Sequence, residues 1–481
     1  MVSLLDSYES GGFSEIGEPG SIRAHYAALV DRIDQFSSED LDDRFRLCES
    51  IFQRQGITFA VYGSSEGTER TWPLDLVPRI IPGDEWAHVE AGLAQRVRVL
   101  NTFLDDLYVG DQAAINDGVV PRWLVESSEG YMPEVQGIEV PSGSRCVISG
   151  IDLVRDDQGV YRVLEDNLRV PSGVSYVMEN RVAMTRVLPV AFSRYRVRPV
   201  GHYGASLLQA LRHAAPSGIS DPTIVVLTPG VLNSAYFEHA FLARQLGVEL
   251  VEGRDLVVRD HSVYMRTTHG LRNVDVIYRR VADEFIDPVV FRSDSMLGVP
   301  GLMSAVRAGT VTIANAIGNG VADDKAVYAF VPDMIRYYLN EEPILPNVTT
   351  YLPWNPDQME LILERIGELV VKPVAEAGGK GIVIGPQADE RALERTAKAV
   401  RRDPRGFIAQ EVVQLSTHPT FVDGGLAPRH IDLRPFVLSG EKVEVIPGGL
   451  TRVALREGSL VVNSSAGGGS KDTWVLAEES I

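Results

Sequence analysis

The stretch VLEDNLRVPSG, residues 163–173, ends a run of alternating residues with an acid and an amide two positions apart. Alternation with period two places Glu165 and Asn167 on one face of a strand and Asp166 on the other. Burying an acid beside an amide is costly unless a charged group lies between them. Mg²⁺ accepts such oxygen ligands and completes its shell with substrate phosphates and waters. The pair therefore indicates a site for a hard cation.

A second acid comes from the preceding predicted strand. VISGIDLV (147–154) passes through the turn DDQG, and a turn of this length pairs Arg155 with Val160. In that register Asp152 lies on the same face as Glu165, roughly 7–8 Å away on the diagonal. The two acids and the amide could then converge as three oxygen donors. The alternative is a solvated hairpin whose acids face outward.

Groups that could bind phosphates occur mainly in the last third of the chain. Lys372 ends the predicted strand LVVKP (369–373), and the glycines after it form a turn whose backbone amides can close over a polyphosphate. Lys325 begins the predicted helix that follows GNGVADD. The other candidate phosphate-binding groups, in the glycine turn and in the loop after the acid–amide pair, are Gly378, Gly379, Lys380, Gly381, Ser172 and Gly173. The alternatives are an ordinary hairpin turn and a solvated first-turn lysine, because the P-loop pattern G-x-x-x-x-G-K-[ST] does not occur.

Polar residues also interrupt later apolar strands. FIAQEVVQL (407–415) contains Gln410 and Glu411, and such a strand could present its backbone to an adenine and Glu411 to a ribose. An edge strand with polar faces is the alternative. Three charged residues follow on further strands: Asp432, Arg434 and Arg452. Each arginine could simply pair with a neighbouring acid, but clusters on strand ends and glycine loops together favour a polyphosphate site.

These residues require elements from distant parts of the chain. Apolar residues at helical spacing predict a helix over 87–108, and TIVVLTPGVLNSAYFEHAFLARQLGVELV (223–251) predicts a βαβ unit of a parallel sheet. A glycine-rich turn and a helix at 314–339 begin a third section. We therefore expect three parts, at residues 1–200, 201–308 and 309–481, and the length of 481 residues agrees with roughly three domains.

Composition sets outer limits on function. The chain is 44% hydrophobic and 23% charged, as in globular proteins, and its net charge of −19 argues against nucleic-acid binding. Only two cysteines occur, Cys48 and Cys146, which fits a reducing cytosol and a structural role for both. The start, MVSLLDSYESGGFSE, has no basic region, and we find no apolar run near ~20 residues. We expect a soluble, cytoplasmic protein without a signal peptide or membrane span.

Together these residues resemble the ATP-grasp superfamily of carboxylate–amine ligases, which clamp ATP between two α+β lobes. The usual order places the metal-binding set last; here it comes first, as in the circularly permuted (type 2) ATP-grasp proteins that are similar to glutathionylspermidine synthetases. The resemblance runs from about Tyr62 to Trp474 and is carried by VLEDNLRVPSGVSYVMENR, NSAYFEHAF, ADDKAVYAFVP and VVNSSAGGGSKDTWVL. It implies an α+β / α/β fold: a permuted ATP-grasp fold with a pre-ATP-grasp βαβ domain at 201–308. The metal-binding half would then lie within 1–200, behind an N-terminal helical region, and the nucleotide-binding half at 309–481.

The resemblance also implies roles for single residues. The implied ligands of Mg²⁺, two ions in all, are Asp152, Glu165 and Asn167. The implied ATP-binding residues are Lys325 and Lys372, a mobile phosphate lid at Gly378–Gly381, and Gln410, Glu411 and Val413 around the adenine and ribose. Arg452 and Lys372 would act in catalysis, with Arg452 facing the transferred phosphate. The chain departs from the glutathionylspermidine type at Gly150, where those enzymes carry a catalytic arginine two residues before the metal-binding aspartate; Arg169, Arg181 and Arg452 are the candidate replacements.

The implied activity is ATP-dependent C–N ligation of a small-molecule or peptide carboxylate with an amine, through an acyl phosphate. A phosphotransferase on the same fold and a non-catalytic scaffold in a complex are the alternatives. A dinucleotide oxidoreductase is disfavoured because the βαβ turn TPGVLNS lacks G-x-G-x-x-G. The acceptor could bind at this turn, near Glu238 and His239, or at Arg279 and Arg280, although helix capping and ion pairing explain these residues equally well.

Overall fold

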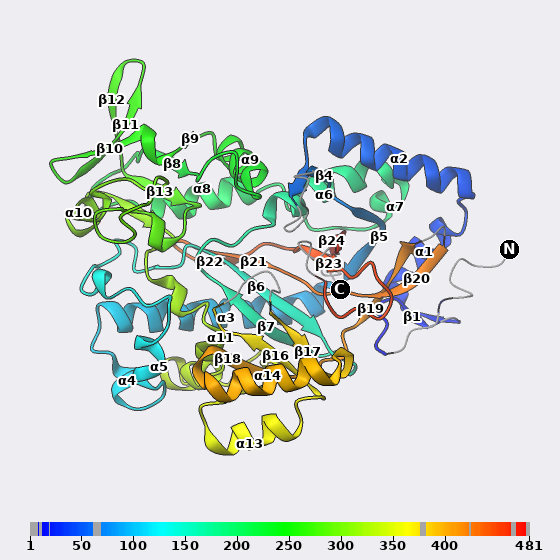
Figure 1. Ribbon diagram of the computed structural model, residues 1–481. Helices are drawn as coiled ribbons and strands as arrows, with labels where there is room; N and C mark the ends of the chain where they lie inside the picture. The colour runs from blue at the N-terminus through cyan, green and yellow to red at the C-terminus, as the bar shows by residue number, and fades with distance from the viewer. Residues whose placement is uncertain are drawn as a thin grey trace.

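The computed structural model describes Tyr8 and residues 12–18, 20–60, 69–375, 381–422, 425–462 and 468–477. At its centre, two sheets join strands from the first and last thirds of the chain (Figure 1). The first has the order β22-β21-β6-β7, with β6 at Ile148–Arg155, β7 at Tyr161–Asn167, β21 at Phe436–Ser439 and β22 at Val443–Val445. The second has the order β23-β24-β5, with β5 at Leu74–Ile81, β23 at Thr451–Val453 and β24 at Gly469–Val475.

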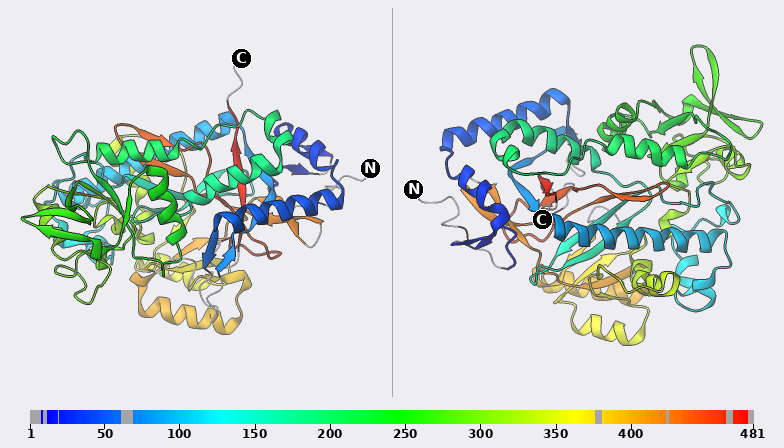
Figure 2. Two further views of the ribbon diagram at one scale, coloured as in Figure 1. Left: turned by 90° about the horizontal axis from the view of Figure 1, so that it is seen from above. Right: turned by 180° about the vertical axis from the view of Figure 1, so that it is seen from behind.

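A long helix, α3 (Gly83–Tyr108), packs against both sheets and includes the helix predicted at 87–108. Its apolar stripe includes Trp86, Leu93 and Val97, which are buried together with core residues of the strands. Seen from behind in Figure 2, α3 runs along the length of the molecule across the central strands. Residues at helical spacing thus form one wall of the core that positions the β6–β7 hairpin.

A parallel sheet of order β14-β13-β8-β9 forms the middle of the chain. Its strands are β8 (Ile224–Leu227), β9 (Glu249–Val251), β13 (Val276–Arg279) and β14 (Thr312–Ala314). The helix α9 (Tyr236–Leu246) connects β8 to its parallel neighbour β9, so the predicted βαβ unit is confirmed. β14 lies beyond the predicted boundary at 308, and that boundary stays a prediction.

A fourth sheet, of order β15-β18-β16-β17, lies beside the β6–β7 hairpin (Figure 1). Its strands are β15 (Thr350–Tyr351), β16 (Leu369–Pro373), β17 (Val383–Ile384) and β18 (Phe407–Glu411), with α13 (Pro356–Glu364) and α14 (Glu390–Arg402) packed on one face. The strand predicted at 369–373 is confirmed, and that predicted at 407–415 ends at Glu411.

The helix predicted after GNGVADD is divided into three pieces, α11 (Lys325–Tyr328), α12 (Val331–Met334) and the π-helical turn η6 (Ile335–Leu339). Pro332 lies in the first turn of α12 and has no N–H to continue α11, so the chain starts a new helix there.

The other described elements complete the molecule around these sheets. The strands are β1 Gly17–Glu18, β2 Ser21–Ile22, β3 Thr58–Ala60, β4 Glu69–Thr71, β10 Leu256–Arg259, β11 Ser262–Thr267, β12 Gly270–Val274, β19 Thr417–Val422 and β20 Gly425–His430. The helices are α1 Ala27–Ile33, α2 Ser38–Gln55, α4 Ala113–Asn116, α5 Arg122–Glu126, α6 Val174–Val187, α7 Pro189–Arg194, α8 Tyr203–His213 and α10 Leu302–Arg307. The 3₁₀ turns are η1 Ala24–Tyr26, η2 Pro133–Val135, η3 Gly253–Asp255, η4 Asp283–Phe285, η5 Asn319–Val321, η7 Gly385–Gln387 and η8 Pro404–Gly406. Cys48 and Cys146 are buried free thiols. Among the described residues, no helix has the length and apolarity needed to cross a membrane.

Candidate active site

The β6–β7 hairpin carries two acids directly opposite each other. Asp152 pairs with Glu165, and Arg155 pairs with Tyr161 instead of Val160, so the predicted register is wrong. The pairing shifts between Asp152 and Leu153 because β7 has one extra residue there, a β-bulge that a count of turn residues cannot reveal. The one-residue shift at the turn and the bulge together move Glu165 from the predicted diagonal position to the position facing Asp152.

Two arginines bind Asp152. Arg434 donates from Nε and Nη2 to the two carboxylate oxygens at 2.5 and 2.7 Å, and Arg452 donates from Nη2 to Oδ2 at 2.6 Å. Arg452 also pairs with the buried Asp432. Burial raises the pKa of Asp152, but the charges of Arg434 and Arg452 outweigh burial and hold the pKa well below its usual range.

Glu165 differs from Asp152 in its electrostatic environment. Burial, followed by the negative charge of Asp152, raises the pKa of Glu165, although Lys325, Arg434 and Lys372 lower it in part. Its ion-pair contact to Arg434 is long, 3.7 Å between Nη2 and Oε1. The pKa values of the two facing acids are thus shifted in opposite directions. A cation that approaches Glu165 stabilises the charged form of this side chain.

Two lysines face the acids from the fourth sheet and α11. Lys372 on β16 is buried, and burial together with the charge of Lys325 lowers its pKa to about 8, although Glu165 opposes the shift. Lys325 begins α11, whose N-terminus is capped by Asp324, and its Nζ lies 3.5 Å from the carbonyl oxygen of Val374. Both cations are therefore held near the negative hairpin.

One cavity, called here the central cavity, lies between the hairpin and the fourth sheet. Its polar lining consists of Asp152, Glu165, Lys325, Lys372, Gln410, Glu411, Asp432 and Arg452. Its apolar lining includes Val154, Leu164, Val348, Val370, Ile384, Val413, Leu415, Leu460, Val461 and Val462. The early acids and the late lysines thus meet around one space. Sequence reasoning missed most of the apolar lining, because scattered valines and leucines carry no motif.

Other predicted residues lie outside this lining or already have protein partners. The Ser172 hydroxyl accepts a hydrogen bond from Arg280 at 2.6 Å, and the Gly173 amide donates to Glu238 at 2.7 Å. Asn167 follows Glu165 on the same face, and its Nδ2 is buried without a hydrogen-bond partner in the described part of the chain. Gly378, Gly379 and Lys380 lie outside the described residues, and Gly381 follows them at a positive φ of 68°.

The end of β18 presents two polar side chains to the central cavity. Gln410 donates from Nε2 to Thr350 at 3.0 Å, while its Oε1 is buried without a partner among the described residues. The Glu411 carboxylate accepts two hydrogen bonds from Arg365, at 2.8 and 3.0 Å, and one from Tyr351 at 2.6 Å. Gln410 thus retains an acceptor for a ligand, whereas Glu411 is already engaged.

A metal site at the hairpin would use oxygen ligands. Within the ranges that the structure describes, no three His, Cys, Asp or Glu side chains are arranged for a metal ion. Two facing carboxylates, with the side-chain amide of Asn167 following on the same face to offer its oxygen, nevertheless fit Mg²⁺, which takes one or two carboxylates and relies on phosphates and waters for the rest.

The candidate replacements for the arginine absent at Gly150 lie in different places. Arg169 pairs with Asp323 at 2.8 Å, and Arg181 pairs with Asp472 at 2.9 Å; among the described residues neither forms an ion pair with Asp152 or Glu165. Arg452 reaches Asp152, and so does Arg434, which sequence reasoning had not named for this role.

Comparison with known proteins agrees with this arrangement. A family model described as circularly permuted ATP-grasp type 2 matches residues 78–454. An uncharacterized protein of Mycobacterium tuberculosis is 56% identical over 459 residues, which cover 95% of this chain and 82% of the relative. A putative glutamate–cysteine ligase of Frankia alni is 45% identical over 476 residues, covering 98% of this chain but only 54% of the relative, so the chain spans about half of that protein. The solved structure of a glutathione synthetase-like effector from Globodera pallida superposes with a TM-score of 0.58 at 13% identity, covering 92% of this chain and 98% of the effector, and this likeness concerns the fold alone.

Proposed function

Because the chain belongs to the circularly permuted ATP-grasp type 2 family, we propose that it is an ATP-dependent carboxylate–amine ligase that forms an amide or peptide bond. The observation that carries the proposal is the central cavity, which is lined by two acids of one hairpin and by two lysines. The lysines follow the acids by more than 150 positions in the sequence. The ligase name of the Frankia relative supports the reaction class. Proteins of this family generally use ATP and Mg²⁺.

The proposed nucleotide position follows from the two kinds of lining. The apolar residues at the β16–β18 side, with the free acceptor of Gln410, suit an adenine ring. Lys325 and Lys372 line the same cavity as the hairpin acids and would bind the phosphates. Asp152, Glu165 and Asn167 would hold Mg²⁺, which would neutralise charge on the phosphates.

The chemistry assigns distinct tasks to the chain's own residues. The substrate carboxylate attacks the terminal phosphorus of ATP, the bond to ADP breaks, and an acyl phosphate forms; the amine then attacks the acyl carbon and expels phosphate. Arg452 and Lys372 would stabilise charge on the oxygens of the transferred group. The apolar wall that includes Leu460 and Val462 would keep water from the acyl phosphate.

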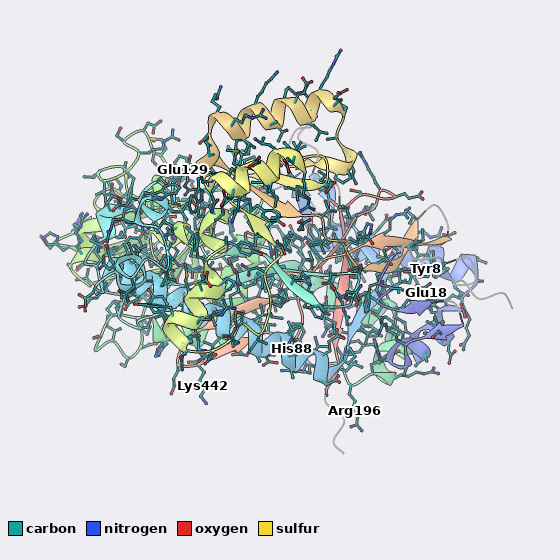
Figure 3. All side chains as sticks on the ribbon, turned by 90° about the horizontal axis from the view of Figure 1, so that it is seen from below. Tyr8, Glu18, His88, Glu129, Arg196 and Lys442 are labelled. Carbon is teal, nitrogen blue, oxygen red and sulfur yellow. The ribbon has the colours of Figure 1, made fainter. Side chains whose placement is uncertain are left out.

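The test is ADP release screened over a panel of carboxylic acids and amines, with mass spectrometry of the products. We expect ADP and phosphate only when both an acid and an amine are present, together with a product whose mass equals acid plus amine minus water. A phosphorylated product without an amine would instead favour the phosphotransferase. A chain that binds no ATP would favour the scaffold. Lys442→Ala, at an exposed lysine labelled in Figure 3, is the control for surface substitution.

A further inference from the structure

Gly150 and Arg434 occupy complementary space beside the acids. Gly150 lies in β6, two residues before Asp152 and therefore on the same face. A Cβ atom at Gly150 would lie 3.3 Å from Cδ and 3.5 Å from Cγ of Arg434, and 3.2 Å from Cβ of Pro171. The arginine stem and Pro171 thus crowd the space that a side chain at position 150 would need.

The guanidinium of Arg434 is held on the acid face by several contacts. It makes a two-pronged ion pair with Asp152, lies 3.7 Å from Glu165 and donates from Nη1 to the carbonyl oxygen of Ser172 at 3.3 Å. Its backbone is fixed too, because Arg434 and Leu450 exchange two hydrogen bonds of 2.9 Å. The side chain is only 14% exposed, so both ends of the residue are held.

Arg434 and Arg452 differ in the acids that they bind. Arg452 has its own buried partner, Asp432, in addition to Asp152. The ion pairs of Arg434 within the described part of the chain are with Asp152 and Glu165, the two facing acids of the hairpin. Arg434 therefore contacts both acids at once.

We propose that Arg434 is a positioning residue that supplies, from the segment just before β21, the arginine that β6 lacks, and that position 150 is glycine so that Arg434 can enter. It orients Asp152 toward Glu165 and thereby sets the geometry in which the two acids take Mg²⁺ with the phosphates. The inference rests on the proposed function for its chemistry, but the packing of Arg434 over Gly150 is independent of the reaction.

The experiment moves the arginine from position 434 to position 150 on β6. Three variants are compared with the wild-type chain: Arg434→Ala, the double variant Gly150→Arg with Arg434→Ala, and Arg98→Ala. The last is a control that removes an exposed arginine paired with Glu341. Calorimetry measures the affinity for ATP at a series of Mg²⁺ concentrations, and ADP release is measured on the same samples.

Residues that orient metal ligands contribute about 10–100-fold to metal affinity or activity. We therefore expect Arg434→Ala to weaken Mg²⁺-dependent ATP binding at least about tenfold, and the double variant to recover most of this loss. Arg98→Ala should behave as the wild type. Recovery by an arginine at position 150 separates positioning from a general structural role, because an arginine on β6 would not replace a merely structural Arg434.

Several results would overturn the inference. They are unchanged or tighter Mg²⁺-dependent ATP binding in Arg434→Ala, a double variant no better than the single one, and a wild-type chain that binds no Mg²⁺·ATP. If Arg434→Ala does not fold, Arg434→Lys keeps the charge but loses the two-pronged contact, and wild-type binding by that variant counts against the proposal equally. A wild-type chain that binds Mg²⁺·ATP but releases no ADP with any acid and amine sinks the ligase proposal alone.

Discussion

The two faces of β7 carry neighbouring acids in different surroundings. Asp166 faces α3, where Arg96 donates to both of its oxygens at 2.6 and 2.7 Å and also binds Asn347; its side chain is fully buried. Glu165, one residue earlier, lines the central cavity, is 32% exposed and, among the described residues, has one ion-pair contact, a long one to Arg434. An acid whose hydrogen bonds are complete stabilises the fold, whereas an acid with bonds still to make is available to a ligand.

The largest expected effect tests the face of β7 that carries Asp166, whose hydrogen bonds are complete. Asp166→Asn leaves the buried Arg96 without its charge partner, and breaking such a pair costs about 3–5 kcal/mol of unfolding free energy. We expect the denaturation midpoint to fall accordingly, while ADP release by the folded variant stays within a few-fold of wild type. Urea titration followed by circular dichroism measures the first quantity. A loss of stability below ~1 kcal/mol, typical of a surface pair, would break the comparison.

The second prediction tests the opposite face of β7, where Glu165 lines the central cavity. Glu165→Gln removes the acid that faces Asp152, and loss of one such electrostatic group lowers turnover about 10²–10³-fold. Its stability should not fall, because burial and Asp152 already disfavour the charged form of Glu165, as its raised pKa shows. ADP release and urea titration of the same sample give both values. Near wild-type ADP release from Glu165→Gln, with Lys442→Ala as control, would count against the site.

What the sequence predicts well here depends on local pattern. Period-two alternation placed Glu165 and Asp166 on opposite faces, and Lys372 ends its strand at the position expected. The bulge in β7 was missed because it depends on how the two strands pack, and so was the contact of Arg434 with Asp152, which spans 282 positions. The engagement of Gly173 by Glu238 was missed for the same reason. Local rules place a residue on a face, but they do not say which distant residue meets it there.

The third prediction concerns the cation side of the central cavity. With a pKa of about 8, Lys372 loses its proton as the pH rises through 8, and with it the charge that would attract phosphate. If only the protonated form binds, affinity for ATP should fall about tenfold between pH 7 and pH 9. Lys372→Arg stays charged over this range and should flatten the profile, measured by calorimetry in buffers of equal ionic strength. A wild-type profile that is flat in this range would contradict the assignment of Lys372 to the phosphates.

The smallest expected effect comes from another buried cluster, formed by Glu238, Arg280 and His239, whose side chains are hydrogen-bonded within the protein. Glu238 accepts from Ser175 and Arg280, and His239 shares a 2.9 Å hydrogen bond with Thr228. Burial and the charge of Arg280 hold the pKa of His239 well below its ordinary value, so the folded chain keeps this histidine neutral.

The unfolded chain takes up a proton at His239 near pH 6.5, whereas the folded chain does not, so this contribution to stability is complete above pH 6.5 and is lost as the pH falls below it. The slope is at most about 1.4 kcal/mol per pH unit for this group. Replacing His239 by glutamine, which keeps a hydrogen-bonding side chain, should therefore reduce the loss of stability between pH 7 and pH 5.5, as measured by urea titration at both values. An equal loss of stability in the variant would show that the acid sensitivity originates elsewhere. It would also contradict the inference that burial keeps His239 neutral in the folded chain.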